Sequence, residues 1–100
     1  MASLHAAALR VELRIPGATS LKEKRRVLRA LVAELSRSQT VAVAEIAHQD
    51  RWQRAALGVA VVAADASHLA RMLHDVERTL RAGTRHEVLD VAVSYLEEPG

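Results

Sequence analysis

The hydrophobic residues of this chain repeat with a strand-like period in some segments and a helical period in others. The order of these segments along the chain restricts the folds that it can adopt. Some segments alternate between apolar and polar residues, as a half-buried strand does, and others repeat at helical spacing. The segments cover residues 9–15, 21–35, 41–47, 55–63, 69–80 and 86–96. They predict the order strand, helix, strand, strand, helix, strand.

Capping residues place the ends of the two helices. Pro16-Gly17 ends the first strand, and Ser20 with Glu23 forms a capping box that starts a helix extending to about Ser38. Asp65 is a good N-cap for the second helix, and Gly83 ends it. In the last strand, alternation assigns one face to Leu89, Val91, Val93 and Tyr95.

Two helices are too few to cover both faces of a four-stranded sheet. An antiparallel sheet with both helices on one face is the economical arrangement. This predicts an α+β, ferredoxin-like βαββαβ fold in a single domain over residues 1–100, with its core at about 5–96. Half of the residues are hydrophobic, but the chain has no Phe, one Trp and one Tyr, so the core should be aliphatic.

Composition also narrows the class of protein. The chain has no Cys, which excludes disulfides and thiolate chemistry. Arg10, Glu12 and Arg14 interrupt the N-terminal segment, and no apolar run approaches the ~20 residues of a membrane span. We therefore expect a soluble cytoplasmic protein without a membrane partner.

The net charge is only +2, but one helix carries a narrow row of cations, which we call the basic stripe. Lys22, Arg25, Arg26 and Arg29 follow the i, i+3, i+4, i+7 spacing, beside the apolar face. Positive charge is disfavoured at a helix N-terminus, and three of the four have no acid three or four positions away. The stripe is therefore a candidate phosphate-binding surface, with support from Lys24, Arg10 and Arg14; the alternative is a solvated helix face.

The helix-free face of the predicted sheet has small residues at its centre. They are Ala42, Ala44, Ala56, Gly58 and Ala60. A flat face of this kind could pack against a second copy or simply face solvent. It offers no aromatic for stacking on bases, because Tyr95 shares the parity of the core residues.

The polar segment between the two central strands contains the only Trp. It predicts a hairpin, and its candidate contact residues are His48, Gln49, Asp50, Trp52 and Arg54. Trp52 could anchor a partner, or it could cover the end of the core.

Catalytic and metal-binding patterns are not found. The five histidines lack metal-ligand spacing, and there is no P-loop, nucleophile elbow or dinucleotide-binding turn. Acylphosphatases use an Asn to orient water, and this chain has no Asn. We expect no catalytic residue, metal, cofactor or small-molecule substrate.

Two motifs carry a family resemblance. The first is Ser-Leu-Lys-Glu-Lys-Arg at residues 20–25, and the second is His-Gln-Asp-Arg-Trp-Gln-Arg at residues 48–54. Both look like motifs of the bacterial YlxP-like proteins, domain-of-unknown-function family 503. Ala47 departs from the pattern, in which an acid often precedes His-Gln-Asp. The resemblance implies a ferredoxin-like fold and proximity to translation and ribosome-maturation genes, and it brings no catalytic residue with it.

Two functions follow as hypotheses. The first is a non-catalytic accessory factor that binds structured RNA or a ribosomal subunit through the basic stripe. The second is a homodimeric protein-interaction module that uses the helix-free sheet face or an exposed edge strand.

Overall fold

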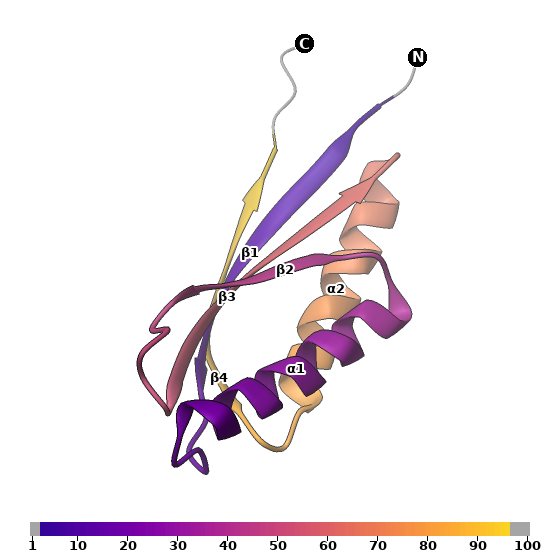
Figure 1. Cartoon of the computed structure of the whole chain (residues 1–100). Helices are drawn as coiled ribbons and strands as arrows, with labels where there is room; N and C mark the ends of the chain where they lie inside the picture. The colour runs from indigo at the N-terminus through magenta and orange to yellow at the C-terminus, as the bar shows by residue number, and fades with distance from the viewer. Residues whose placement is uncertain (1–2, 97–100) are drawn as a thin grey trace.

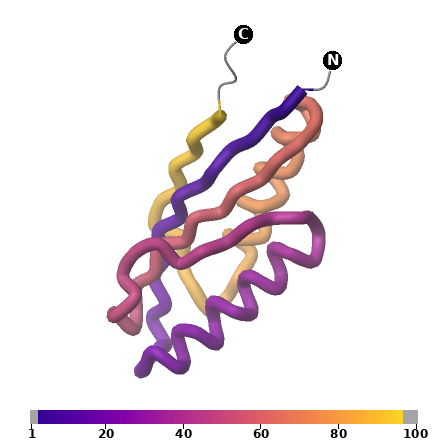
Figure 2. The backbone as a smooth tube through the Cα atoms, turned by 45° about the horizontal axis from the view of Figure 1, so that its top comes forward, coloured from indigo at the N-terminus to yellow at the C-terminus, as the bar shows by residue number. Residues whose placement is uncertain are grey.

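A computed structural model describes residues 3–96, and it has the predicted order of elements (Figure 1). The elements are β1 (His5–Arg14), α1 (Leu21–Ser38), β2 (Ala42–Ala47), β3 (Arg54–Ala63), α2 (Ala66–Ala82) and β4 (Glu87–Tyr95). The four strands form one antiparallel sheet in the order β2-β3-β1-β4. Both helices cover the same face of this sheet (Figures 1 and 2), so the ferredoxin-like prediction is confirmed.

Both predicted helix starts are present. The hydroxyl of Ser20 accepts a hydrogen bond from the Glu23 backbone N–H at 3.1 Å, and Asp65 accepts one from the His68 N–H at 2.7 Å. The Glu23 carboxylate in turn accepts from the N–H and the hydroxyl of Thr19, 2.9 Å each, instead of from Ser20. These bonds satisfy N–H groups that a helix N-terminus leaves without partners.

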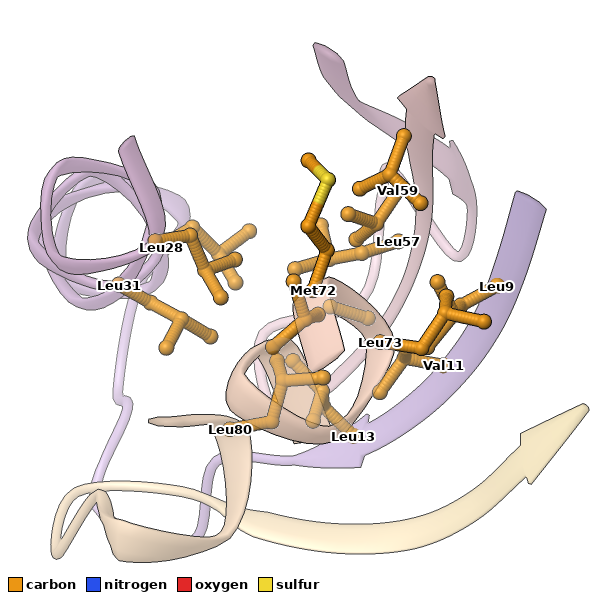
Figure 3. Close-up of a cluster of buried hydrophobic side chains, with 14 of the residues drawn as sticks. Leu9, Val11, Leu13, Leu28, Leu31, Leu57, Val59, Met72, Leu73 and Leu80 are labelled. Atoms are coloured by element: carbon orange, nitrogen blue, oxygen red, sulfur yellow. The ribbon is translucent and has the colours of Figure 1, made fainter. Parts of the chain in front are cut away.

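The core lies between the helices and the inward face of the two central strands (Figure 3). Leu9, Val11 and Leu13 of β1 are almost completely buried, as are Leu57 and Val59 of β3. Leucines, valines and Met72 of the helices pack on them. Burying each such side chain stabilises the fold by about 1.5–3 kcal/mol, which an aliphatic core achieves without aromatic residues.

The last strand differs from the sequence prediction. Leu13 pairs with Val88 while Glu12 pairs with Asp90, so Leu89 is the extra residue of a β-bulge. Val88 therefore packs against the core in place of Leu89, which is 48% exposed. Tyr95 keeps the expected parity, opposite Ala7, but it is 63% exposed because the helices pack mainly on the central strands and leave this end of β4 uncovered.

Within residues 3–96, neither helix has the length and apolar character that crossing a membrane requires.

Candidate nucleic-acid interface

A buried lysine joins the two sequence motifs. The Nζ of Lys24 in α1 lies 2.8 Å from Oε2 of Glu45 and donates to the backbone carbonyls of His48 at 2.9 Å, Arg54 at 3.3 Å and Gln49 at 3.4 Å. Lys24 is 1% exposed. It fixes the β2–β3 hairpin against the first turns of α1, so it is not available to a phosphate and must be removed from the expected RNA contacts.

Gln53 provides a second connection at the same end of the molecule. Its side-chain amide donates to the carbonyls of Pro16 at 3.3 Å and Ala18 at 3.2 Å, and its own carbonyl accepts from the Ile15 N–H at 2.9 Å. The hairpin, the β1–α1 loop and the start of α1 therefore form one end of the structure, and Figures 1 and 2 show them together.

The basic stripe lies on the exposed side of α1. Lys22, Arg25, Arg26 and Arg29 are all exposed, and none of them makes an ion pair with a carboxylate among residues 3–96. Arg25 and Arg29 border a shallow hollow between α1 and the edge strand β2. Four cations without an ion-pair partner in the described part of the chain can interact with an external anion.

Arg85 is a further exposed cation, and no sequence motif points to it. It lies in the loop between α2 and β4 and lines, with Arg26 and the β1–α1 loop, a hollow of about 490 Å³. Both arginines help to lower the pKa of Glu23, although the hydrogen bonds from Thr19 lower it more. No local pattern links Arg85 to Arg26, because the two are distant in sequence and only the packing of α1 against the α2–β4 loop brings them together.

Arg10 and Arg14 lie elsewhere. Their positions in β1 alternate with the buried ones, so they project from the helix-free face, and the sheet separates them from α1. Arg10 Nε is 3.8 Å from Glu12 Oε1, and Arg14 Nε is 3.6 Å from Glu87 Oε2. They do not extend the surface of the basic stripe.

Two of the candidate hairpin residues hold the hairpin to the sheet. His48 Nε2 is 3.1 Å from Oε2 of Glu12, and an Nη of Arg54 is 3.2 Å from the same oxygen. Burial raises the pKa of Glu12, but the hydrogen bonds and charges of His48 and Arg54 outweigh it and leave this pKa below its ordinary value. His48 also adopts a φ of 63°, a left-handed conformation uncommon for residues with a side chain.

The remaining hairpin residues are presented to solvent. Gln49, Asp50, Arg51 and Trp52 are exposed, and Trp52 is 53% accessible. Trp52 therefore does not cover the end of the core.

The helix-free face is less uniform than the sequence suggests. Ala56 is 0% exposed and cannot contact a partner. A register shift between Glu45 and Ala47 places Ile46 over Gly58, with its Cγ2 3.2 Å from where a Cβ on Gly58 would lie. Ala42, Ala44 and Ala60 are exposed, and Val62 extends the same face.

Residues 3–96 contain no group of three or more His, Asp or Glu side chains that could hold a metal ion.

Fold and surface together define a small ferredoxin-like α+β protein whose basic helix and polar hairpin share one end. The fold is similar to that of a de novo designed protein, Foldit4, with a TM-score of 0.57 and 15% identity over 97% of this chain and 100% of that one. At this identity the likeness concerns the fold alone.

The family follows from the sequence comparison. Residues 6–93 match the family described as protein of unknown function (DUF503), and the chain belongs to this family. The uncharacterized protein YlxP of Bacillus subtilis (strain 168) is 44% identical over 45 residues, which are 45% of this chain and 49% of YlxP. The match thus spans about half the length of this curated relative. The resemblance to YlxP-like proteins is confirmed.

Proposed function

We propose that this protein is a non-catalytic accessory factor that binds structured RNA, as in a ribosomal particle, through the basic stripe of α1. The observation that carries the proposal is the exposure of Lys22, Arg25, Arg26 and Arg29 without an ion-pair partner among the described residues. Every other Arg of α1, β1 and β3 is ion-paired, as is Lys24. Of the cations without an ion pair among residues 3–96, these four lie together on one helix, whereas Arg51, Arg71 and Arg85 lie elsewhere.

The geometry of the stripe suits a phosphate backbone. From Lys22 to Arg29 the helix rises about 10 Å, which places the side chains along a short length of one nucleic-acid strand. Contacts to phosphates position a protein on a helix without reading its sequence. The sheet face has no aromatic residue for stacking, which favours a structured RNA over an extended single strand laid across the sheet.

Phosphate contacts predict a steep salt dependence. With a slope of about −0.9 per phosphate, four contacts imply a loss of about 100-fold in affinity between about 50 and 200 mM salt. Replacing the four residues by Gln should reduce both the affinity and this slope.

The test is co-sedimentation with ribosomal subunits, and filter binding to bulk structured RNA, over a salt series. The variant Lys22→Gln/Arg25→Gln/Arg26→Gln/Arg29→Gln is compared with the parent and with a control that loses the same charge elsewhere. The control replaces Arg37, Arg71, Arg78 and Arg81, which are exposed on the last turn of α1 and on α2. We expect the stripe variant alone to lose binding. Equal losses in both variants, or an unchanged salt slope, would contradict the proposal.

A second candidate function is self-association through the helix-free face. Ala42, Ala44, Ala60 and Val62 are exposed there with no covering helix, and small side chains let two sheets approach closely. The edge strand β4 offers a second surface for self-association, because its own residues Val93 and Tyr95 are exposed. Replacing Ala60 by Glu, and measuring the mass of the particle in solution, tests this candidate.

A further inference from the structure

The side chain of Trp52 lies outside the hydrophobic core. It is the only Trp of the chain, it is 53% exposed, and it is not part of the hydrophobic core. Beside it the hairpin forms a shallow hollow of about 330 Å³, lined by Asp50, Arg51, Trp52, Gln53 and Arg54. Large exposed aromatic side chains with polar neighbours are typical of contact sites.

The loop that carries Trp52 is held rigidly. Lys24 donates to two backbone carbonyls that precede Trp52 in the chain and to one that follows it. Gln53 binds the β1–α1 loop, and the Arg51 N–H donates to the His48 carbonyl at 3.0 Å. Glu12 fixes the residues at both ends of the loop. Trp52 is thus pre-organised, so a ligand that stacks on it would not have to order the loop first.

Trp52 lies at the same end of the molecule as the basic stripe. Lys24 connects the hairpin directly to the helix turns that carry Lys22, Arg25 and Arg26 (Figures 1 and 2). Arg51, next to Trp52, is exposed and makes no ion pair among residues 3–96. A further exposed cation therefore lies next to Trp52, with the exposed carboxylate of Asp50 on its other side.

We propose that Trp52 stacks on an unpaired nucleobase of the RNA whose backbone the basic stripe holds. This inference rests on the function proposed above and names the class of ligand: a double-helical RNA with a single-stranded nucleotide beside it. A-form helices hide most base edges, so a protein gains a contact with a base chiefly where the base is unpaired. Stacking needs only a π-face, which every base has, and Arg51 would hold the adjoining phosphate.

The experiment uses the intrinsic fluorescence of Trp52, which is free of signal from any other Trp. A blunt RNA duplex and the same duplex with a single-stranded extension are titrated into the parent, Trp52→Ala, Trp52→Phe and the stripe variant. Quenching is read in the parent and the stripe variant. Filter binding gives the affinities of all four proteins, because Trp52→Ala and Trp52→Phe have no Trp to quench. Thermal unfolding of Trp52→Ala checks its fold, which should be unchanged because the side chain is exposed. Trp52→Phe keeps an aromatic ring and serves as the conservative variant.

We expect the extended RNA to bind the parent more tightly than the blunt duplex and to quench Trp52. Trp52→Ala should bind the extended RNA roughly 5- to 100-fold more weakly, the effect of losing one stacked base, with an unchanged salt slope. Trp52→Phe should recover part of the loss. Equal binding of both RNAs without quenching would overturn this inference and leave the proposed function intact. Failure of both RNAs to bind at low salt would overturn both.

Discussion

Lys24 Nζ and Glu45 Oε2 lie 2.8 Å apart, and this pair joins the first turns of α1 to the edge strand β2. Glu45 shares the Lys24 ammonium with three carbonyls of the hairpin. A cation in a run of basic residues thus acts as an internal support, while its neighbours remain exposed.

Replacing Lys24 by Met should destabilise the protein by about 3 kcal/mol. The substitution keeps the length of the side chain but leaves the Glu45 carboxylate and the hairpin carbonyls without their donor. Urea unfolding measures the change, with Lys22→Met as an exposed control expected to stay within about 0.5 kcal/mol of the parent. Similar stabilities for the two variants would show that Lys24 does not support the fold.

Replacing Glu12 by Gln should destabilise the protein at neutral pH by about 1 kcal/mol or less, because the interactions with His48 and Arg54 are partly exposed. Since the pKa of Glu12 is lowered in the folded state, its contribution is fully present above the unfolded value near 4.5 and is lost as the pH falls through the folded pKa. The stability difference between the variant and the parent should therefore disappear in acid. A difference that is the same at every pH would contradict a charge-dependent role.

Replacing Gly83 by Ala should cost about 1–3 kcal/mol, because the new Cβ would overlap the imidazole ring of His86. The ring cannot move away freely, since His86 Nε2 is 2.6 Å from the Leu80 carbonyl oxygen. Gly17→Ala is the matched control: nothing lies within 4 Å of its Cβ position, and its φ is not positive. Thermal unfolding should show a lower Tm for Gly83→Ala alone.

Replacing Ala60 by Glu should break a dimer that forms through the helix-free face. Ala70→Glu, on the exposed side of α2, is the control, and Val93→Glu tests the β4 edge separately. Light scattering at micromolar concentration should give twice the monomer mass for the parent and the control, and the monomer mass for Ala60→Glu. A monomeric parent would end this second candidate.

Much of the fold could be predicted from local sequence. Ser20 and Asp65 cap the helices as their side chains predict, because capping depends on atoms within three residues. Glu23 differs, since its carboxylate accepts from Thr19 and not from Ser20. Strand alternation assigned the faces of β1 and β3 correctly. It failed at Leu89, because a β-bulge adds one residue to β4 and inverts the parity before it.

The candidate site was predicted less well. The basic run that contains Lys24 predicts an RNA contact, although Lys24 shares its helix face with Leu28, Leu31 and Leu35, at i+4, i+7 and i+11. That spacing was the signal of its burial. No spacing of this kind points to Arg85, which lies in the loop between α2 and β4.

Local sequence is enough to predict the order of the elements, the helix boundaries and the row of cations on α1, because these depend on periodicity and on short-range hydrogen bonds. The tertiary structure decided which cations are free. Whether a lysine or arginine faces solvent depends on carbonyls and carboxylates that distant segments bring to it, as the hairpin brings Glu45 and His48 to Lys24. Those partners are set by how the layers pack, which no local spacing encodes.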